Sequence, residues 1–181
     1  MGSPQLAAAS DNPSFLAIHP DGNHLYAANE VGDFGGKSSG AITAFKINRE
    51  TGKLTSINQQ ATRGAAPCHL IVDPKGKHVL VANYSGGSIA ALPLRSDGGI
   101  EPISSFHQHS GSSVTRRQSE PHAHSINLDS AGRFAFAADL GLDKILIYRF
   151  DSGLLIPNEP ASASVAPGAG PRHFAFHPSG S

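Results

Sequence analysis

Hydrophobic and polar residues alternate in short runs along most of this chain, and the runs come in pairs. Residues 118–139 show the pattern, with alternating apolar positions at 126–128, a Ser-Ala-Gly turn, and a second apolar run at 134–138. Alternation with a period of two, interrupted by a glycine-containing turn, is typical of two antiparallel strands. The pattern therefore predicts a β-hairpin.

The hairpin pattern recurs along the chain. Residues 12–30 and 66–84 repeat it, a fourth copy begins at residue 170, and the turn glycines are Gly22, Gly76, Gly132 and Gly180. A period of roughly 50 residues with strand-like units is typical of propellers and related arrays. Two further strand patterns follow each complete hairpin, and no segment shows a sustained helical period. The sequence thus predicts an all-β fold, a β-propeller of four-stranded antiparallel blades. We expect the first strand of each repeat to be the most buried and the fourth to be the most polar, at the rim.

The repeats also predict how the chain is divided. We expect blades at 12–60, 66–106 and 120–163, the first strand of a fourth blade at 170–181, and a disordered or artificial start at 1–11. Propellers typically have about four to eight blades, so three cannot close a ring. The sequence therefore predicts a partial propeller, whose open blade edges are a surface for self-association.

Composition narrows the classes of function. The 20 glycines, 13 prolines and 15% charged residues fit a turn-rich β-protein, and the net charge of zero without a basic run argues against a nucleic-acid partner. No apolar segment has the length of a membrane span. The single cysteine, Cys68, excludes an intrachain disulfide and is interpreted as a small buried side chain. No signal peptide is visible, so we expect a cytoplasmic protein, with the periplasm and secretion as open alternatives.

Antiparallel connectivity separates the loops into two sets. The segments before each first strand and after each second strand lie at one end of the blades, and the hairpin turns lie at the other. The polar, acidic and histidine-containing loops share the first end, around the mouth of the central channel. His19, His24, His78 and His177 fall in the opposite set. We interpret these four as turn residues.

His122 and His124 are the stronger candidates for catalytic residues. Alternate residues of an extended segment point the same way, so both imidazoles could face the channel. Imidazole titrates near neutral pH, which suits a general acid or base. A metal site would need a third ligand, for which Glu120 and His69 are only loosely located, and backbone-bonded loop histidines are the structural alternative. We predict no metal and no cofactor.

Arginine side chains are the second group of candidate site residues, because they can bind or stabilise negative charge. Arg172 and His173 begin the fourth repeat, and an arginine there could bind a carboxylate or phosphate, stabilise an oxyanion, or form a salt bridge between blades. Arg116 and Arg117 lie in a long loop that is either an anion-binding flap or a solvated charge pair. The candidate catalytic residues are His124, Arg172 and His122, and the candidate substrate-binding residues are His173, His69, Glu120, Arg116, Arg117 and Asn83.

Several segments, among them ANEVGDFGG, VANYSGGSIA, PHAHS, ADLGLDKILIYRFD and GAGPRHFAFHPSG, give the chain a recognisable signature. It resembles the seven-bladed propeller lactonases, a family that includes a 6-phosphogluconolactonase and is related to a fungal carboxymuconate-lactonising enzyme (muconate cyclase). The resemblance implies a hydrolase without a cofactor that opens a sugar-acid lactone. It assigns the family's histidine to His124 and the arginine of its PRH motif to Arg172. The family has an acid and a further arginine in later blades, so we expect impaired activity from about half of the propeller.

The expected reaction is hydrolysis of 6-phosphogluconolactone to 6-phosphogluconate, in the pentose phosphate pathway. His124, aided by His122, would activate water, and Arg172 would neutralise the developing oxyanion. Arg116, Arg117 or His173 would hold the phosphate. Two alternatives stay open: a lactonising or cycloisomerising reaction that uses the same His and Arg, and a propeller that serves as a binding scaffold without catalysis.

Overall fold

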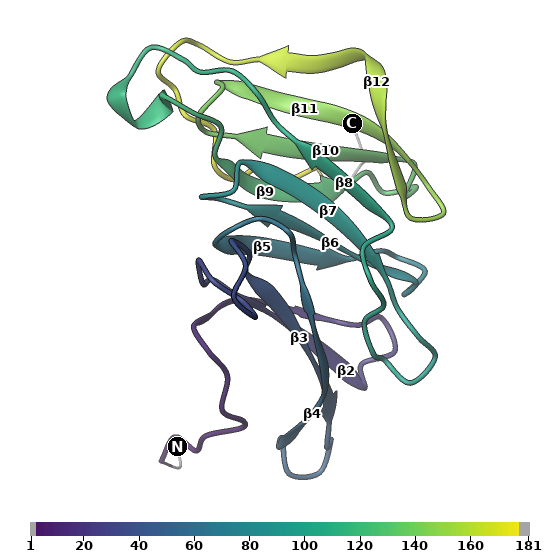
Figure 1. The fold of residues 1–181 in the computed structure, drawn as a ribbon. Coiled ribbons are helices and arrows are strands. Elements are labelled where there is room, and N and C mark those ends of the chain that lie inside the picture. Colours follow the sequence, from purple (N-terminus) through teal and green to yellow (C-terminus); the bar gives the residue numbers. More distant parts are fainter. Residues whose placement is uncertain (1–2, 178–181) are drawn as a thin grey trace.

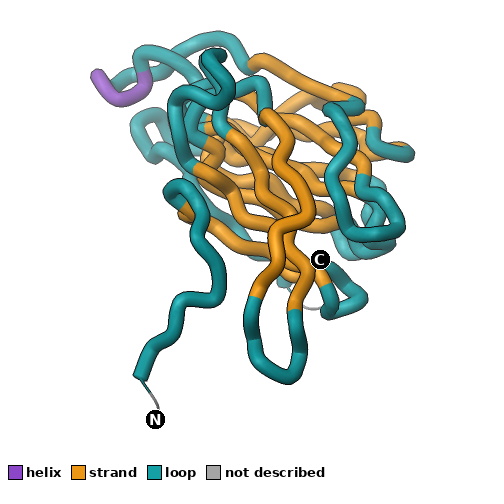
Figure 2. Tube along the Cα trace, turned by 60° about the horizontal axis from the view of Figure 1, so that its bottom comes forward, coloured by secondary structure: helices purple, strands orange, loops and turns teal. Residues whose placement is uncertain are grey.

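The computed structural model describes residues 3–177, which form almost nothing but β-strands and loops (Figures 1 and 2). Each complete repeat makes one four-stranded antiparallel sheet whose strands follow chain order. The first sheet contains β1 (Pro13–Ile18), β2 (His24–Asn29), β3 (Ala41–Ile47) and β4 (Leu54–Ala61). The second contains β5 (Pro67–Val72), β6 (His78–Asn83), β7 (Ser88–Pro93) and β8 (Ser105–Gln108). The third contains β9 (Ala123–Leu128), β10 (Phe134–Asp139), β11 (Lys144–Asp151) and β12 (Leu154–Ser164).

The three sheets fan out one above the other (Figure 1), which confirms the prediction of an all-β partial propeller. A three-residue 3₁₀ helix, η1 (Arg116–Gln118), projects from one end of the third sheet. Within residues 3–177 no helix is long and apolar enough to cross a membrane.

Glycine fixes the hairpin turns that define the repeat. Gly22, Gly76 and Gly132 have φ angles of 67°, 65° and 65°, a region that other L residues rarely adopt. In the second and third hairpins the carboxylates of Asp73 and Asp129 accept a backbone N–H from four residues further on, at 2.7 and 2.6 Å. Side-chain capping of this kind is why aspartate is common in turns.

Two apolar clusters hold the sheets together, one on each face of the second sheet. Because alternate residues of a strand point to opposite faces, Val79 and Val81 of β6 join the cluster shared with the first sheet. Leu80 and Ala82 join the cluster shared with the third sheet. Burying each large apolar side chain contributes about 1.5–3 kcal/mol. The second sheet is therefore buried on both faces.

The prediction that the first strand of each repeat is the most buried is wrong for the first and second sheets, whereas in the third sheet β9 has four buried residues, as many as β10 and more than β11. On β1, Leu16 is 54% exposed and Ile18 is 63% exposed. In the first two sheets, buried residues instead concentrate on the second and third strands, β2, β3, β6 and β7. Those strands have a hydrogen-bonded neighbour on each side, whereas the first strand is an edge. Strand β12 is largely exposed, as expected for a rim strand.

Residues 170–177, predicted to begin a fourth blade, form no strand in the structure. A strand needs a neighbouring strand to pair with, and none of the twelve described strands pairs with this segment. Its aromatic rings pack against the third sheet instead. Phe174 and Phe176 have ring centroids 6.5 and 5.4 Å from that of Phe136 on β10. The rest of the predicted strand, with Gly180, lies outside the described residues.

Candidate functional site

Three histidines that are distant in sequence meet at the end of the sheets that the loop analysis singled out. His69 lies on β5, His124 lies on β9, and His173 lies in the segment after β12. The ring centroid of His173 is 5.7 Å from that of His69 and 4.9 Å from that of His124. The stacking of the second and third sheets therefore creates the cluster.

A cavity of about 350 Å³ opens beside this cluster, and we call it the cleft. It lies between elements of all three sheets and the segment after β12. Its lining consists of Ser14, Phe15, Glu30, Cys68, Tyr84, Arg117, His124, Arg172 and His173.

Arg172 and His124 are in direct contact. The Nε–H of Arg172 donates a hydrogen bond to Nε2 of His124 at 3.0 Å. Nε2 is thus the acceptor, which leaves the proton of the neutral ring on Nδ1. Nδ1 is buried and has no hydrogen-bond partner among the described groups. The prediction that these two residues share one end of the blades, within reach of one ligand, is confirmed.

The surroundings keep His124 neutral. Burial lowers the pKa of its imidazole, and the positive charges of Arg172, His173 and Arg117 lower it further. Desolvation and nearby like charge both disfavour the protonated ring. The geometry therefore provides an uncharged imidazole that faces a guanidinium.

His69 forms the wall behind the cleft. Burial lowers the pKa of this imidazole to about 4, and the charged forms of His173 and His124 act in the same direction. Its Nδ1 accepts the backbone N–H of Ile126 at 3.3 Å, and its ring lies 4.4 Å from that of Phe15. His69 thus supports Phe15 and His173, both of which line the cleft.

Tyr84, which the sequence analysis missed, organises the other side. Its ring stacks on His122 at 4.5 Å between centroids and lies 5.5 Å from His124. Nε–H of Arg117 donates to the Tyr84 hydroxyl at 3.1 Å. Nδ1 of His122 lies 3.1 Å from the Tyr84 carbonyl oxygen. His122 is therefore a backbone-bonded loop histidine that supports Tyr84. The available signal was an aromatic residue in a loop at the histidine-rich end.

The remaining predicted site residues divide into two groups. Arg117 and Arg172 line both the cleft and an adjoining cavity of about 280 Å³. The side chains of Arg116 and Glu120 are exposed, and among the described residues neither lines these two cavities. Asn83 is fully buried, and its amide donates to a serine hydroxyl of β7 at 3.1 Å. The structure therefore keeps Asn83 away from any ligand in the cleft.

Two further lining residues were not anticipated as site residues. Glu30 brings a carboxylate to the cleft from the loop after β2. Cys68 is half-buried, and its thiol lies 3.4 Å from the carbonyl oxygen of His124. Burial raises the pKa of this thiol to about 12, so it is not a thiolate nucleophile at neutral pH.

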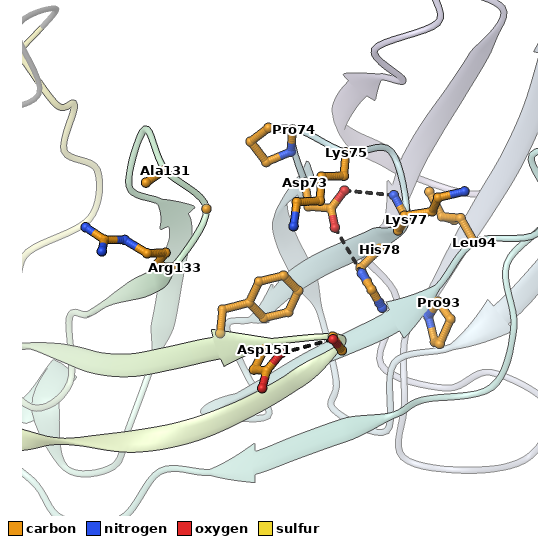
Figure 3. Close-up of a pocket in the computed structure, with 13 residues that line it drawn as sticks. Asp73, Pro74, Lys75, Lys77, His78, Pro93, Leu94, Ala131, Arg133 and Asp151 are labelled. Carbon is orange, nitrogen blue, oxygen red and sulfur yellow. Dashed lines mark hydrogen bonds and ion pairs between the residues drawn. The ribbon is translucent and has the colours of Figure 1, made fainter.

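The opposite end of the sheets has a larger cavity, of about 700 Å³, in which Asp73 and His78 are already bonded to each other and to the turn (Figure 3). Asp73 accepts the backbone N–H of Lys77 at 2.7 Å, and its other oxygen lies 2.9 Å from Nδ1 of His78. These bonds cap the turn between β5 and β6. They support the interpretation of His78 as a turn residue.

A group at the same end has the residue types of a metal site. Ligand atoms of His19, Asp21 and His24 lie within 4.8 Å of one another. Each already serves the turn, however. Nδ1 of His24 is 2.9 Å from Asp21, the other Asp21 oxygen accepts a backbone N–H at 2.7 Å, and Nε2 of His19 is 3.0 Å from the Gly76 carbonyl oxygen. Turn capping accounts for the cluster without an ion.

Comparison with known proteins agrees with this architecture. A 6-phosphogluconolactonase of Bacillus subtilis is 36% identical over 178 residues, which are 98% of this chain and 49% of that protein. One of Formosa agariphila is 35% identical over 186 residues, covering 99% of this chain and 52% of that protein. The chain thus spans about half the length of the curated relatives it matches.

Solved structures give the same result. The structure described as the Pseudomonas aeruginosa periplasmic gluconolactonase superposes with a TM-score of 0.88 at 35% identity, covering 96% of this chain and 50% of that one. A family model described as "Lactonase, 7-bladed beta-propeller" matches residues 1–181. With three propeller-type sheets and a match over the whole sequence, the chain belongs to the seven-bladed β-propeller lactonase family.

Proposed function

We propose that this chain carries part of the active site of a lactone hydrolase. The proposed substrate is 6-phosphogluconolactone, opened to 6-phosphogluconate in the pentose phosphate pathway. The observation that carries the proposal is the 3.0 Å contact between Arg172 and His124 at the cleft, which joins an oxyanion donor to a candidate base. The names of the curated relatives support this substrate class.

The contact also constrains the mechanism. The lone pair of Nε2 that a general base would use is occupied by the Nε–H of Arg172. We infer that substrate binding draws the guanidinium toward the lactone carbonyl oxygen and that a water molecule takes its place on Nε2. The neutral ring then accepts a proton from this water as the oxygen attacks the carbonyl carbon.

Ring opening completes the reaction. Arg172 stabilises the oxyanion of the tetrahedral intermediate, and the bond between the carbonyl carbon and the ring oxygen breaks. The imidazolium of His124 returns its proton to the leaving alkoxide, which gives a hydroxyl group and a carboxylic acid, and the acid then releases its proton to solvent to become the carboxylate. The neutral state of His124, favoured by burial and by the neighbouring cations, suits the first of these steps.

Arg117 and His173 are the proposed phosphate ligands, because both line the cleft. Arg116 has no such position, and we assign it no role in binding. The cytoplasmic location expected from the sequence stays a proposal, because one solved relative is described as periplasmic. The following experiment distinguishes lactone hydrolysis from a lactonising reaction and from a purely binding role.

The test measures opening of 6-phosphogluconolactone by the wild-type protein and by its His124→Gln variant. General acid-base groups typically contribute about 10²- to 10⁴-fold, so we expect a loss of that size with the fold retained. His78→Gln, at the opposite end of the sheets, is the matched control and should keep full activity.

Full turnover by His124→Gln would contradict the proposal. Wild-type protein that binds the lactone without opening it would favour a scaffold. Closure of a muconate-type acid in preference to lactone opening would favour the lactonising alternative.

A further inference from the structure

One buried carboxylate accepts four hydrogen bonds beside the cleft. Asp143 lies in the loop between β10 and β11, is 4% exposed, and has a positive φ of 53°. Its Oδ2 accepts the hydroxyl of Ser113 at 2.6 Å and the N–H of Gly168 at 2.6 Å. Its Oδ1 accepts the side-chain amide of Gln118 at 2.6 Å and the N–H of Gly170 at 2.7 Å.

The four donors come from two segments that carry the arginines of the cleft. Ser113 and Gln118 flank Arg117, and Gly168 and Gly170 immediately precede Arg172. Asp143 therefore joins the loop before β9 to the segment after β12. Both arginines line the cleft and the adjoining cavity, whereas Asp143 lines neither.

The charge of Asp143 is essential to this arrangement. Burial acts to raise the pKa of its carboxyl, but the hydrogen bonds from Ser113, Gly170, Gly168 and Gln118 outweigh it and lower the pKa to about 2. An asparagine has the same shape but only one acceptor oxygen. Whichever way its amide turned, its NH₂ group would meet the N–H of Gly168 or of Gly170. Only a carboxylate satisfies both segments.

We propose that Asp143 is a positioning residue for lactone opening, whose carboxylate clamps the two arginine-bearing segments together so that Arg117 and Arg172 reach the substrate from backbone segments already fixed beside the cleft. Fixing donors before the substrate binds avoids the cost of ordering them during the reaction. The catalytic meaning of this clamp rests on the function proposed above. The clamp itself can be tested without turnover.

The test compares Asp143→Asn with wild-type protein by NMR. Hydrogen bonds to charged acceptors are strong enough that losing one should speed amide exchange at Gly168 or Gly170 about tenfold or more. Release of Arg172 should also raise the pKa of His124, measured by titration of its ring signals. The titratable and charged side chains around His124 are Arg172, Arg117, His173, His69, Tyr84, Cys68 and Glu30. Asp143 is not among them, so a shift must pass through the clamp.

Asp129→Asn is the matched control. Asp129 also accepts two backbone N–H groups, at 2.6 and 2.8 Å, but in a turn at the opposite end of the third sheet. It should leave the exchange at Gly168 and Gly170 and the titration of His124 as they are in wild type. An equal shift in both variants would overturn the proposal, as would an unchanged His124 titration in folded Asp143→Asn.

Ser113→Ala keeps the proposal testable if Asp143→Asn does not fold. It removes one hydroxyl, so it should speed exchange at Nε–H of Arg117 while leaving Gly168 and Gly170 protected. Unchanged exchange at Arg117 would then refute the clamp. If the NMR shifts occur but wild-type protein opens no lactone, the proposed function fails and the clamp stands. If the protein is active and the shifts are missing, the clamp alone fails.

Discussion

Two histidines at opposite ends of the sheets, His78 and His124, have opposite kinds of partner. At the turn end, imidazoles face carboxylates: His78 lies 2.9 Å from Asp73, and His24 lies 2.9 Å from Asp21. At the cleft end, His124 faces a guanidinium at 3.0 Å instead, whereas the buried His109, which does not line the cleft, lies 2.6 Å from Asp139. A histidine bonded to a turn-capping carboxylate has a structural role, whereas one held neutral among cations offers a lone pair for chemistry. The partner of a histidine, more than its presence in a loop, distinguishes the two roles.

The largest expected effect is a loss of turnover, caused by a substitution that alters the cleft end alone. Arg172→Gln removes the guanidinium from His124, and loss of one oxyanion donor typically costs about 10²- to 10³-fold in kcat. We expect a drop of this size in lactone opening. Arg133→Gln, which alters an exposed arginine of the turn-end cavity, should leave turnover unchanged. Equal losses in the two variants would erase the contrast between the ends.

A second effect concerns the pH dependence of stability. The folded pKa of His69 is about 4, below the ordinary value of 6.5, so the unfolded chain binds a proton more readily between these values. This stabilisation is complete above pH 6.5 and is lost as pH falls toward 4, by on the order of 3 kcal/mol. Urea unfolding of wild type and His69→Gln across this range should give a flatter profile for the variant. Parallel profiles would contradict the burial of a neutral imidazole.

A smaller effect should appear at the turn end. Asp73→Asn keeps the side-chain shape but removes the charge that faces His78, which should cost about 1–2 kcal/mol in unfolding free energy. Lactone opening should be unaffected, because this bond lies far from the cleft. Asp151→Asn alters an exposed carboxylate of the same cavity (Figure 3) and should change neither quantity. A loss of activity in Asp73→Asn would show that the two ends are coupled.

The smallest expected effect on stability comes from the exposed strand β1. Ile18→Lys replaces an apolar side chain that is 63% exposed, so the unfolding free energy should change by less than about 0.5 kcal/mol. Self-association through this edge, expected from the open blades, should nevertheless decrease, because a lysine opposes strand-to-strand contact. Light scattering of the two proteins at matched concentration checks this. An unchanged particle size in an associating protein would exclude this edge as the contact.

The fold was predictable because its signals are local. Alternation along each strand and a glycine at each turn specify hairpins, and their recurrence specifies blades. Antiparallel connectivity also brought His124 and Arg172 to one end without any coordinates. The burial of β1 could not be predicted in this way, because it depends on which faces other sheets cover.

The residues that support the cleft could not be predicted from the sequence for a similar reason. Tyr84 is recognisable only from its contacts with His122, His124 and Arg117, which come from other parts of the chain. Asp143 is an ordinary loop aspartate in the sequence. Its role follows from donors about 25 to 30 residues away on both sides, as the spacings of its bonds to Ser113 and Gly168 show. Hydrogen bonds between residues that are far apart in the chain do not produce a periodic pattern in the sequence, so the sequence does not reveal them.

The doubly covered second sheet has a consequence for how the molecule opens. Each sheet contacts only its neighbours, so stability is shared between units in the manner of a one-dimensional array. The first and third sheets can each separate by breaking one apolar interface, whereas the second must break two. Local unfolding should therefore proceed inward from both outer sheets, and the amides of β6 should be the last to exchange with solvent.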